Sequence, residues 1–311
     1  MSLPESAPEA LAPAVAVSTS TDGRNGVIAA LAAYTLWGFL PLLFHAIGAA
    51  GSVMIVAERI VWSLLLLTAI LAFRGGFGDV RALLGDRRRA LLTLLSALLL
   101  AGNWLLYVWA VESGQVLEAS FGYFINPMVN VAMGMVLFGE RQNRLQTVAI
   151  GIAVTAIAIQ AVGLGHVPFI ALGLALSFGF YGYFRKTAHL GPASGLFAET
   201  AILAPVALIY VIFNFATWGP GIHSDPYSLS LMILTGPATT IPLLLFSVAV
   251  RRLRLTTIGM FQYIAPSIQF LLAITLFGEQ LNGLRLVSFV LIWVSLLVFS
   301  WDSFRRRPRA A

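Results

Sequence analysis

The sequence predicts an all-α integral membrane protein whose ten transmembrane helices form two inverted five-helix repeats around a central cavity. Three observations predict this fold. The 311 residues have a mean hydropathy of +0.89 and only 10% are charged, against about a quarter in soluble proteins. Many apolar runs approach the ~20 residues that a helix needs to cross a bilayer core. A four-residue motif also returns in the second half of the chain, with different charges around it.

Ten apolar runs are separated by charged residues, glycine and proline. Runs of this length favour helices over the short alternating strands of a membrane barrel. The expected spans are 26–48, 53–73, 90–111, 116–138 and 145–164 in the first half, and 167–185, 194–215, 228–250, 256–277 and 284–302 in the second.

The two ends of the chain differ from the spans in composition. Residues 1–25 carry Glu5 and Glu9 where a signal peptide has positive charge, so we expect a disordered cytoplasmic tail. Residues 303–311 are rich in arginine and are expected to form a basic cytoplasmic tail. Between the tails, we expect the first five-helix repeat at 26–164 and the second, inverted repeat at 165–302.

Arginine and lysine residues occupy alternate loops. The N-terminal tail, the even-numbered loops and the C-terminus hold all 19 of these residues except Arg59 and Arg285. Because cytoplasmic loops carry the positive excess, both termini are expected to face the cytoplasm. Loop charge then explains the net charge of +6, and no nucleic-acid partner is expected.

A repeated motif relates the two halves at an offset of 139 residues. Leu-Phe-Gly-Glu occupies 137–140 and 276–279, each copy preceded by a proline, at 127 and 266, and followed by an asparagine, at 143 and 282. Since each half has an odd number of helices, the second copy must enter the membrane upside down. Inverted repeats of this kind recur in transporters that bind their substrate near the bilayer midplane. The alternative is an ancestral duplication kept only for packing.

Longer motifs carry a resemblance to a known family. They are LWGFLPL (36–42), ERIVWSLLLL (58–67), NWLLYVWAV (103–111), SFGYFINPMVNVAMGMVLFGERQNRLQ (120–146) and QYIAPSIQFLLAITLFGE (262–279). With them the chain resembles the ten-helix EamA-type members of the drug/metabolite transporter superfamily, and among these the RarD branch, over nearly all of residues 26–302. The resemblance implies a bacterial inner-membrane protein that moves small organic solutes, usually outward. Typical cargo of the relatives is amino acids, including aromatic ones, and drug-like compounds.

Polar and aromatic residues within the spans are the candidates for substrate binding. Tyr123, Asn126 and Asn130 share one face of the fourth span, and Gln269 is the repeat counterpart of Asn130. Amides offer donors and acceptors that suit the charged groups of an amino acid, although they can instead bond neighbouring helices. An aromatic wall suits apolar or aromatic side chains, although aromatic residues also gather at membrane interfaces. The further candidates, from the other spans, are Tyr34, Trp37, Asn103, Tyr107, Ser177, Tyr181 and Tyr263.

Prolines and charges within the spans suggest moving and structural parts. Pro127 and Pro266 each remove a helix hydrogen bond, which kinks the helix or frees a carbonyl, and we expect spans four and nine to act as a gating pair. Glu58 and Glu199 lie near the ends of their spans, where a structural role is expected. Arg59 lies deeper and is expected to contact the cavity or a gate. Glu118 is a weaker candidate for proton coupling.

Several chemistries find no support in the sequence. The chain has no cysteine, its four histidines are scattered, and no metal site is expected. The only lysine is Lys186 and no phosphate-binding loop precedes a helix, so transport is not driven by ATP hydrolysis. We expect no enzyme activity, no cofactor and no obligatory protein partner.

The predicted function is secondary transport that exports amino acids, chiefly apolar or aromatic ones, and related small metabolites across the inner membrane. Two alternatives stay open. One is a drug exporter of the multidrug or chloramphenicol type, and the other is a membrane structural subunit that carries no cargo.

Overall fold

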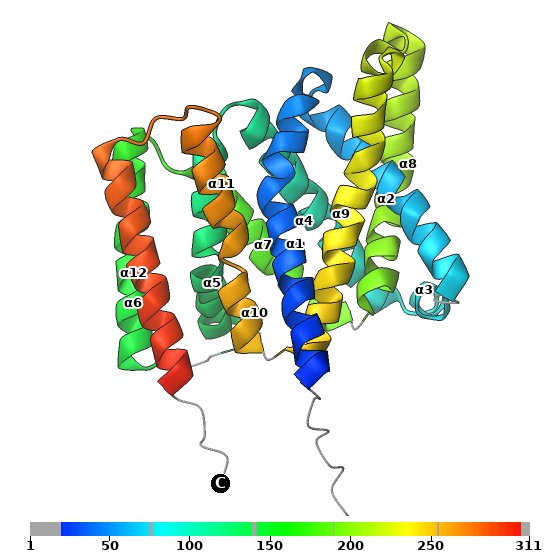
Figure 1. Ribbon diagram of the computed structural model, residues 1–311. Coiled ribbons are helices and arrows are strands. Elements are labelled where there is room, and N and C mark those ends of the chain that lie inside the picture. The colour runs from blue at the N-terminus through cyan, green and yellow to red at the C-terminus, as the bar shows by residue number, and fades with distance from the viewer. Residues whose placement is uncertain (1–19, 75–76, 139–141, 189, 254, 306–311) are drawn as a thin grey trace, which may run out of the picture.

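The protein is a bundle of long helices that run up and down in alternation (Figure 1). The computed structural model describes residues 20–74, 77–138, 142–188, 190–253 and 255–305, and within these ranges it contains no strand. The long helices of the first half are α1 (Ser20–Ala46), α2 (Ser52–Arg74), α4 (Arg87–Glu112), α5 (Val116–Phe138) and α6 (Arg144–Leu164). Those of the second half are α7 (Phe169–Ala188), α8 (Pro192–Trp218), α9 (Pro226–Arg252), α11 (Ile264–Thr275) and α12 (Gly283–Arg305). Short elements lie between them: η1 (Gly48–Ala50), α3 (Gly78–Leu84), η2 (Gly221–Ser224) and α10 (Leu255–Phe261).

The helices have the length and composition of membrane spans. Within the part of the chain that the structure describes, eight spans are long and apolar enough to cross a bilayer, and one further apolar helix, within α7, is shorter. The remaining long helix is α5, which has 23 residues. Every predicted span thus corresponds to a helix or to a pair of consecutive helices, which confirms the all-α membrane fold with ten spans.

The structure differs from the prediction in three places. α1 begins at Ser20, so residues 20–25, which were expected to belong to the disordered tail, are helical. The predicted ninth span is divided into α10 and α11 at Gln262 and Tyr263. Pro266 contributes to the division, because a proline removes one helix hydrogen bond and its ring clashes with the carbonyl four residues earlier, that of Gln262. At the other end of the chain, α12 extends to Arg305.

The helices pack as two copies of one five-helix unit with opposite polarity. α1 packs against α9 and α11, and its repeat counterpart α7 packs against α4 and α5, the counterparts of those two helices. Three further contacts join a helix to its own counterpart: α2 with α8, α5 with α11, and α6 with α12. In Figure 1, α1 begins and α12 finishes on one side of the bundle. α5 finishes on that same side, whereas α11 finishes on the opposite side. This arrangement is the inverted repeat that the sequence predicts.

The repeated Leu-Phe-Gly-Glu motif has a physical role at these helix ends. Gly278 has a φ of +67°, in the left-handed region that glycine adopts without steric cost, and the chain turns there after α11. The carboxylate of Glu279 then accepts hydrogen bonds from the N–H groups of Val116 at 2.5 Å and Leu117 at 3.0 Å. These groups begin α5 and have no partner within their own helix. The repeat counterpart, Glu140, lies outside the described residues.

The repeated asparagines join α6 to α12 in the same symmetric way. The side-chain Oδ1 of Asn143, and likewise that of Asn282, accepts a hydrogen bond from the N–H three residues later, at 3.0 and 2.9 Å, and so caps its helix. The Nδ2 of Asn143 donates to Asp302 Oδ2 at 2.5 Å, near the end of α12. The Nδ2 of Asn282 donates to the Gly163 carbonyl at 2.9 Å, near the end of α6. Each asparagine therefore starts one helix and holds the end of its counterpart.

Two glycines let neighbouring helices approach each other closely. A Cβ atom added to Gly122 of α5 would lie 2.8 Å from the backbone of Ala171 in α7. One added to Gly236 of α9 would lie 2.7 Å from the backbone of Trp62 in α2. Small residues at such crossings are typical of membrane helices, since packing replaces the hydrophobic driving force there.

Candidate functional site

A buried arginine lies between α2, α4 and α9. The side chain of Arg59 is 4% exposed, and its Nε donates a hydrogen bond to Thr239 Oγ1 at 2.5 Å. The guanidinium carbon lies 4.1 Å from the ring centroid of Trp104 and 5.5 Å from that of Phe44. Aromatic faces attract a cation, most strongly when water is excluded. Among the described residues, no carboxylate pairs with this arginine.

Two tyrosines from α4 and α5 lie beside this arginine. The rings of Tyr107 and Tyr123 pack edge to face with centroids 5.5 Å apart, and Tyr107 also packs on Phe44 at 6.1 Å. The Arg59 guanidinium contacts the same Phe44 ring as Tyr107. The hydroxyl of Tyr107 is buried and has no hydrogen-bond partner in the described part of the chain. The same holds for Oδ1 of Asn126, which follows Tyr123 by one helical turn.

A second aromatic group lies where α1 meets α9 and α11. Tyr34 and Trp37 have ring centroids 5.3 Å apart, as their spacing on one helix face predicts, and both contact Phe246 of α9. Gln269 of α11 donates from its Nε2 to the Trp37 carbonyl at 3.2 Å. Its Oε1 is buried without a hydrogen-bond partner among the described residues. Tyr263 lies elsewhere, bonded through its side chain to Ser300 of α12.

The predicted pair Asn103 and Tyr107 divides between two neighbourhoods. Asn103 donates from Nδ2 to the Leu174 carbonyl at 3.1 Å and to Ser177 Oγ at 2.9 Å. Ser177 in turn donates to the Gly173 carbonyl at 2.6 Å. These bonds join α4 to α7. Asn103 therefore bonds a neighbouring helix, which was the alternative to substrate binding for buried amides. Asn130, by contrast, has an exposed side chain.

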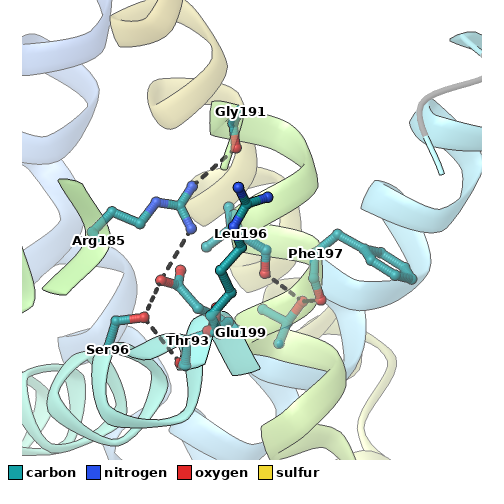
Figure 2. Close-up of polar contacts among 9 residues, drawn as sticks. Thr93, Ser96, Arg185, Gly191, Leu196, Phe197 and Glu199 are labelled. Carbon is teal, nitrogen blue, oxygen red and sulfur yellow. Dashed lines mark hydrogen bonds and ion pairs between the residues drawn. The ribbon is translucent and has the colours of Figure 1, made fainter. Parts of the chain in front are cut away.

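Tyr181 bonds a cluster of charged and polar groups at the end of the bundle where α8 begins. Figure 2 shows Ser96, Arg185 and Glu199 of this cluster. The Glu199 carboxylate is fully buried, forms an ion pair with Arg185 at 3.0 Å and accepts a hydrogen bond from Ser96 Oγ at 2.7 Å. Tyr181 also bonds this carboxylate through its side chain. Arg185 further donates to the Gly191 carbonyl at 3.2 Å, just before α8. The cluster ties α4, α7 and α8 together and agrees with the structural role expected for Glu199.

The counterpart of Glu199 lies at the opposite end of the bundle. Glu58 accepts a hydrogen bond from Trp62 Nε1 at 2.7 Å and pairs with His223 Nε2 at 2.8 Å. His223 comes from η2, so this carboxylate holds the α8–α9 loop against α2. The two related glutamates thus anchor opposite ends of the bundle.

The remaining predicted residues have local roles. Pro127 lies inside α5, which continues through it, whereas Pro266 lies just after the break between α10 and α11. Glu118, a predicted candidate for proton coupling, accepts hydrogen bonds from the N–H groups of Ile170 at 3.0 Å and Ala171 at 3.4 Å. It therefore caps the start of α7. No group of side chains in the described residues has the composition of a metal site.

Sequence reasoning marked Arg59 but missed the residues around it. Phe44, Trp104 and Thr239 come from three different helices. Phe246 beside Trp37 was missed for the same reason. Trp104 stands in a quoted motif, but an apolar residue in an apolar span carries no signal of its own.

Comparison with known proteins agrees with this architecture. The EamA-like transporter family matches residues 24–161. An uncharacterized transporter of Vibrio cholerae is 40% identical over 285 residues, which cover 91% of this chain and 94% of that protein. Protein RarD of Salmonella typhimurium is 44% identical over 283 residues, which cover 90% and 96%. A solved structure with 20% identity and a TM-score of 0.59, which covers 94% of this chain and 100% of its own, shares the fold. The chain therefore belongs to the EamA-like transporters of the drug/metabolite transporter superfamily, in the RarD branch.

Proposed function

We propose that the protein is a secondary transporter that exports amino acids, chiefly apolar or aromatic ones, and related small metabolites across the bacterial inner membrane. Family membership supports transport and a multi-pass location in the membrane. The alternating loop charges support cytoplasmic termini. The absence of a phosphate-binding loop from the sequence supports a secondary mechanism.

One observation carries the choice of amino acids: two amide oxygens are buried without a partner in the described structure. They are Oδ1 of Asn126 on α5 and Oε1 of Gln269 on α11, and these two helices pack against each other. A buried acceptor without a donor costs about 1–3 kcal/mol. An ammonium group has three donors to offer such acceptors, so a bound amino acid removes this cost.

The neighbouring side chains favour an apolar or aromatic amino acid. Gln269 bonds the backbone of Trp37, whose ring packs with those of Tyr34 and Phe246, and Asn126 follows Tyr123 on α5. Aromatic pairs gain about 0.5–1.5 kcal/mol beyond the burial of their surface. A solute with an aromatic side chain gains such contacts when it moves in beside these rings.

Flux measurements in proteoliposomes test the proposal. Purified protein is reconstituted, and the movement of labelled phenylalanine, leucine and chloramphenicol is followed with and without a pH gradient. Saturable flux of the amino acids is expected, and a response to the gradient identifies proton coupling. Flux of chloramphenicol alone favours the drug exporter, and no flux of any solute favours a structural subunit. Asn126→Leu and Gln269→Leu are expected to raise the KM for phenylalanine, whereas Gln280→Leu, at an exposed amide between α11 and α12, serves as the matched control.

A further inference from the structure

Arg59 is a buried cation that has no partner of opposite charge among the described residues. Glu199 pairs with Arg185, and Glu58 pairs with His223. Arg59 has only neutral neighbours: a hydroxyl and aromatic rings. A charged side chain deep in a membrane protein is costly, and such a group usually marks the path of a substrate or ion.

The geometry fixes one side of the guanidinium and leaves the other side available. Nε is held by Thr239 Oγ1, and the ring of Trp104 covers the face of the group. Nη1 and Nη2 donate no hydrogen bond to any residue that the structure describes. These two nitrogens form the planar fork that binds a carboxylate through two parallel hydrogen bonds.

A second donor without a partner lies in the same neighbourhood as this fork. The hydroxyl of Tyr107 is buried and finds no acceptor in the described residues, and the Tyr107 ring packs on Phe44, which the Arg59 guanidinium also contacts. A phenol can donate its proton to an anion. Phe44, Trp104 and Tyr123 surround these polar groups with aromatic surface. An anion bound here has charged and neutral donors at one end and an apolar environment at the other.

We propose that Arg59 and Tyr107 bind the carboxylate of the transported solute, which makes the substrates monocarboxylates with an apolar or aromatic side chain. This inference rests on the proposed transport function and adds to it the group that the protein recognises. In this arrangement the carboxylate of the solute binds at Arg59, and its ammonium group binds at the amide oxygens of α5 and α11. Neutral solutes without a carboxylate then lack the main anchoring interaction.

The first test uses the unmodified protein. Proteoliposomes exchange labelled L-phenylalanine against unlabelled phenylalanine, phenylalaninamide or phenyllactate. Phenylalaninamide keeps the ring and the ammonium group but lacks the carboxylate, and phenyllactate keeps the carboxylate but lacks the ammonium group. We expect phenylalaninamide to compete at least about tenfold less well than phenylalanine, because two charge-assisted hydrogen bonds are lost. Competition by phenylalaninamide equal to that of phenylalanine overturns the inference while the transport function stands.

The second test uses variants of Arg59. Arg59→Gln removes the charge, and Arg59→Lys keeps it but loses the planar fork. Both are expected to raise the KM for phenylalanine at least about tenfold and to remove the preference over phenylalaninamide. Arg88→Gln removes an exposed arginine at the start of α4 and is expected to behave as the unmodified protein. Unchanged discrimination in a folded Arg59→Gln overturns the inference, and if that variant does not fold, the competition assay decides alone. Absence of flux of every solute from the unmodified protein refutes the transport function itself, and the inference with it.

Discussion

The ion pair between Glu199 and Arg185 gives a prediction whose size follows from the structure. The Glu199 side chain is fully buried, the Arg185 side chain is 17% exposed, and their charged atoms are 3.0 Å apart (Figure 2). Removing one partner of a buried pair costs about 3–5 kcal/mol, because the other charge remains buried. Glu199→Gln keeps the shape and an acceptor for Ser96, and Arg185 keeps some contact with solvent. We therefore expect a loss of about 2–3 kcal/mol, at or below the lower limit of that range.

Denaturant titration in detergent micelles measures this loss, and a double-mutant cycle with Arg185→Gln isolates the pair. The matched control is the exposed pair of Arg89 and Asp86, at 3.2 Å and with side chains 46% and 43% exposed. Arg89→Gln is expected to change the free energy of unfolding by less than about 0.5 kcal/mol. A loss for Glu199→Gln no larger than that of Arg89→Gln, or a coupling energy near zero, refutes the reasoning.

Three further predictions concern packing, gating and pH. Gly122→Ala is expected to destabilise the protein by about 1–3 kcal/mol, because its Cβ meets the backbone of α7. The control Gly102→Ala has open space around its Cβ and should not destabilise the protein. Equal unfolding midpoints for the two variants contradict this prediction. Pro127→Ala is expected to change the transport rate more than the yield of folded protein, and an unchanged rate rejects the gating role of α5. Burial raises the pKa of the Glu279 carboxyl, so the native state binds the proton more strongly than the unfolded state. The free energy of unfolding should therefore decrease as the pH rises from the ordinary carboxyl pKa to the raised one. Unfolding titrations between about pH 4 and 8 measure this decrease, and Glu279→Gln should remove it.

Most of the fold could be predicted from the sequence, because membrane helices are defined by local composition. Apolar length marks each span, and loop charge together with the odd number of helices per half gives the inverted arrangement. The break before Pro266 could not be predicted from the proline alone, because α5 continues through its counterpart Pro127. The role of Glu279 could not be predicted either, because its partners Val116 and Leu117 lie more than 150 residues away in the sequence.

The candidate site could be predicted only in part, for a similar physical reason. A charged residue such as Arg59 stands out within an apolar span, and so do amides such as Asn126 and Gln269. The spacing of Asn103 and Tyr107 shows that they share a helix face, but not that Asn103 bonds α7 while Tyr107 faces α1 and α5. Which helices meet around a residue is decided by packing between helices, and the sequence of one span carries little information about it.

Accessibility of single cysteines tests the inverted arrangement most directly. The chain contains no cysteine, so Gln142→Cys, between α5 and α6, and Gln280→Cys, between α11 and α12, can be made in the unmodified background. In intact cells stripped of their outer membrane, a membrane-impermeant maleimide should label Gln280→Cys at once and Gln142→Cys only after the membrane is opened. Labelling of both from the same side of the membrane contradicts the opposite polarity of the two halves, and with it the shared site between them.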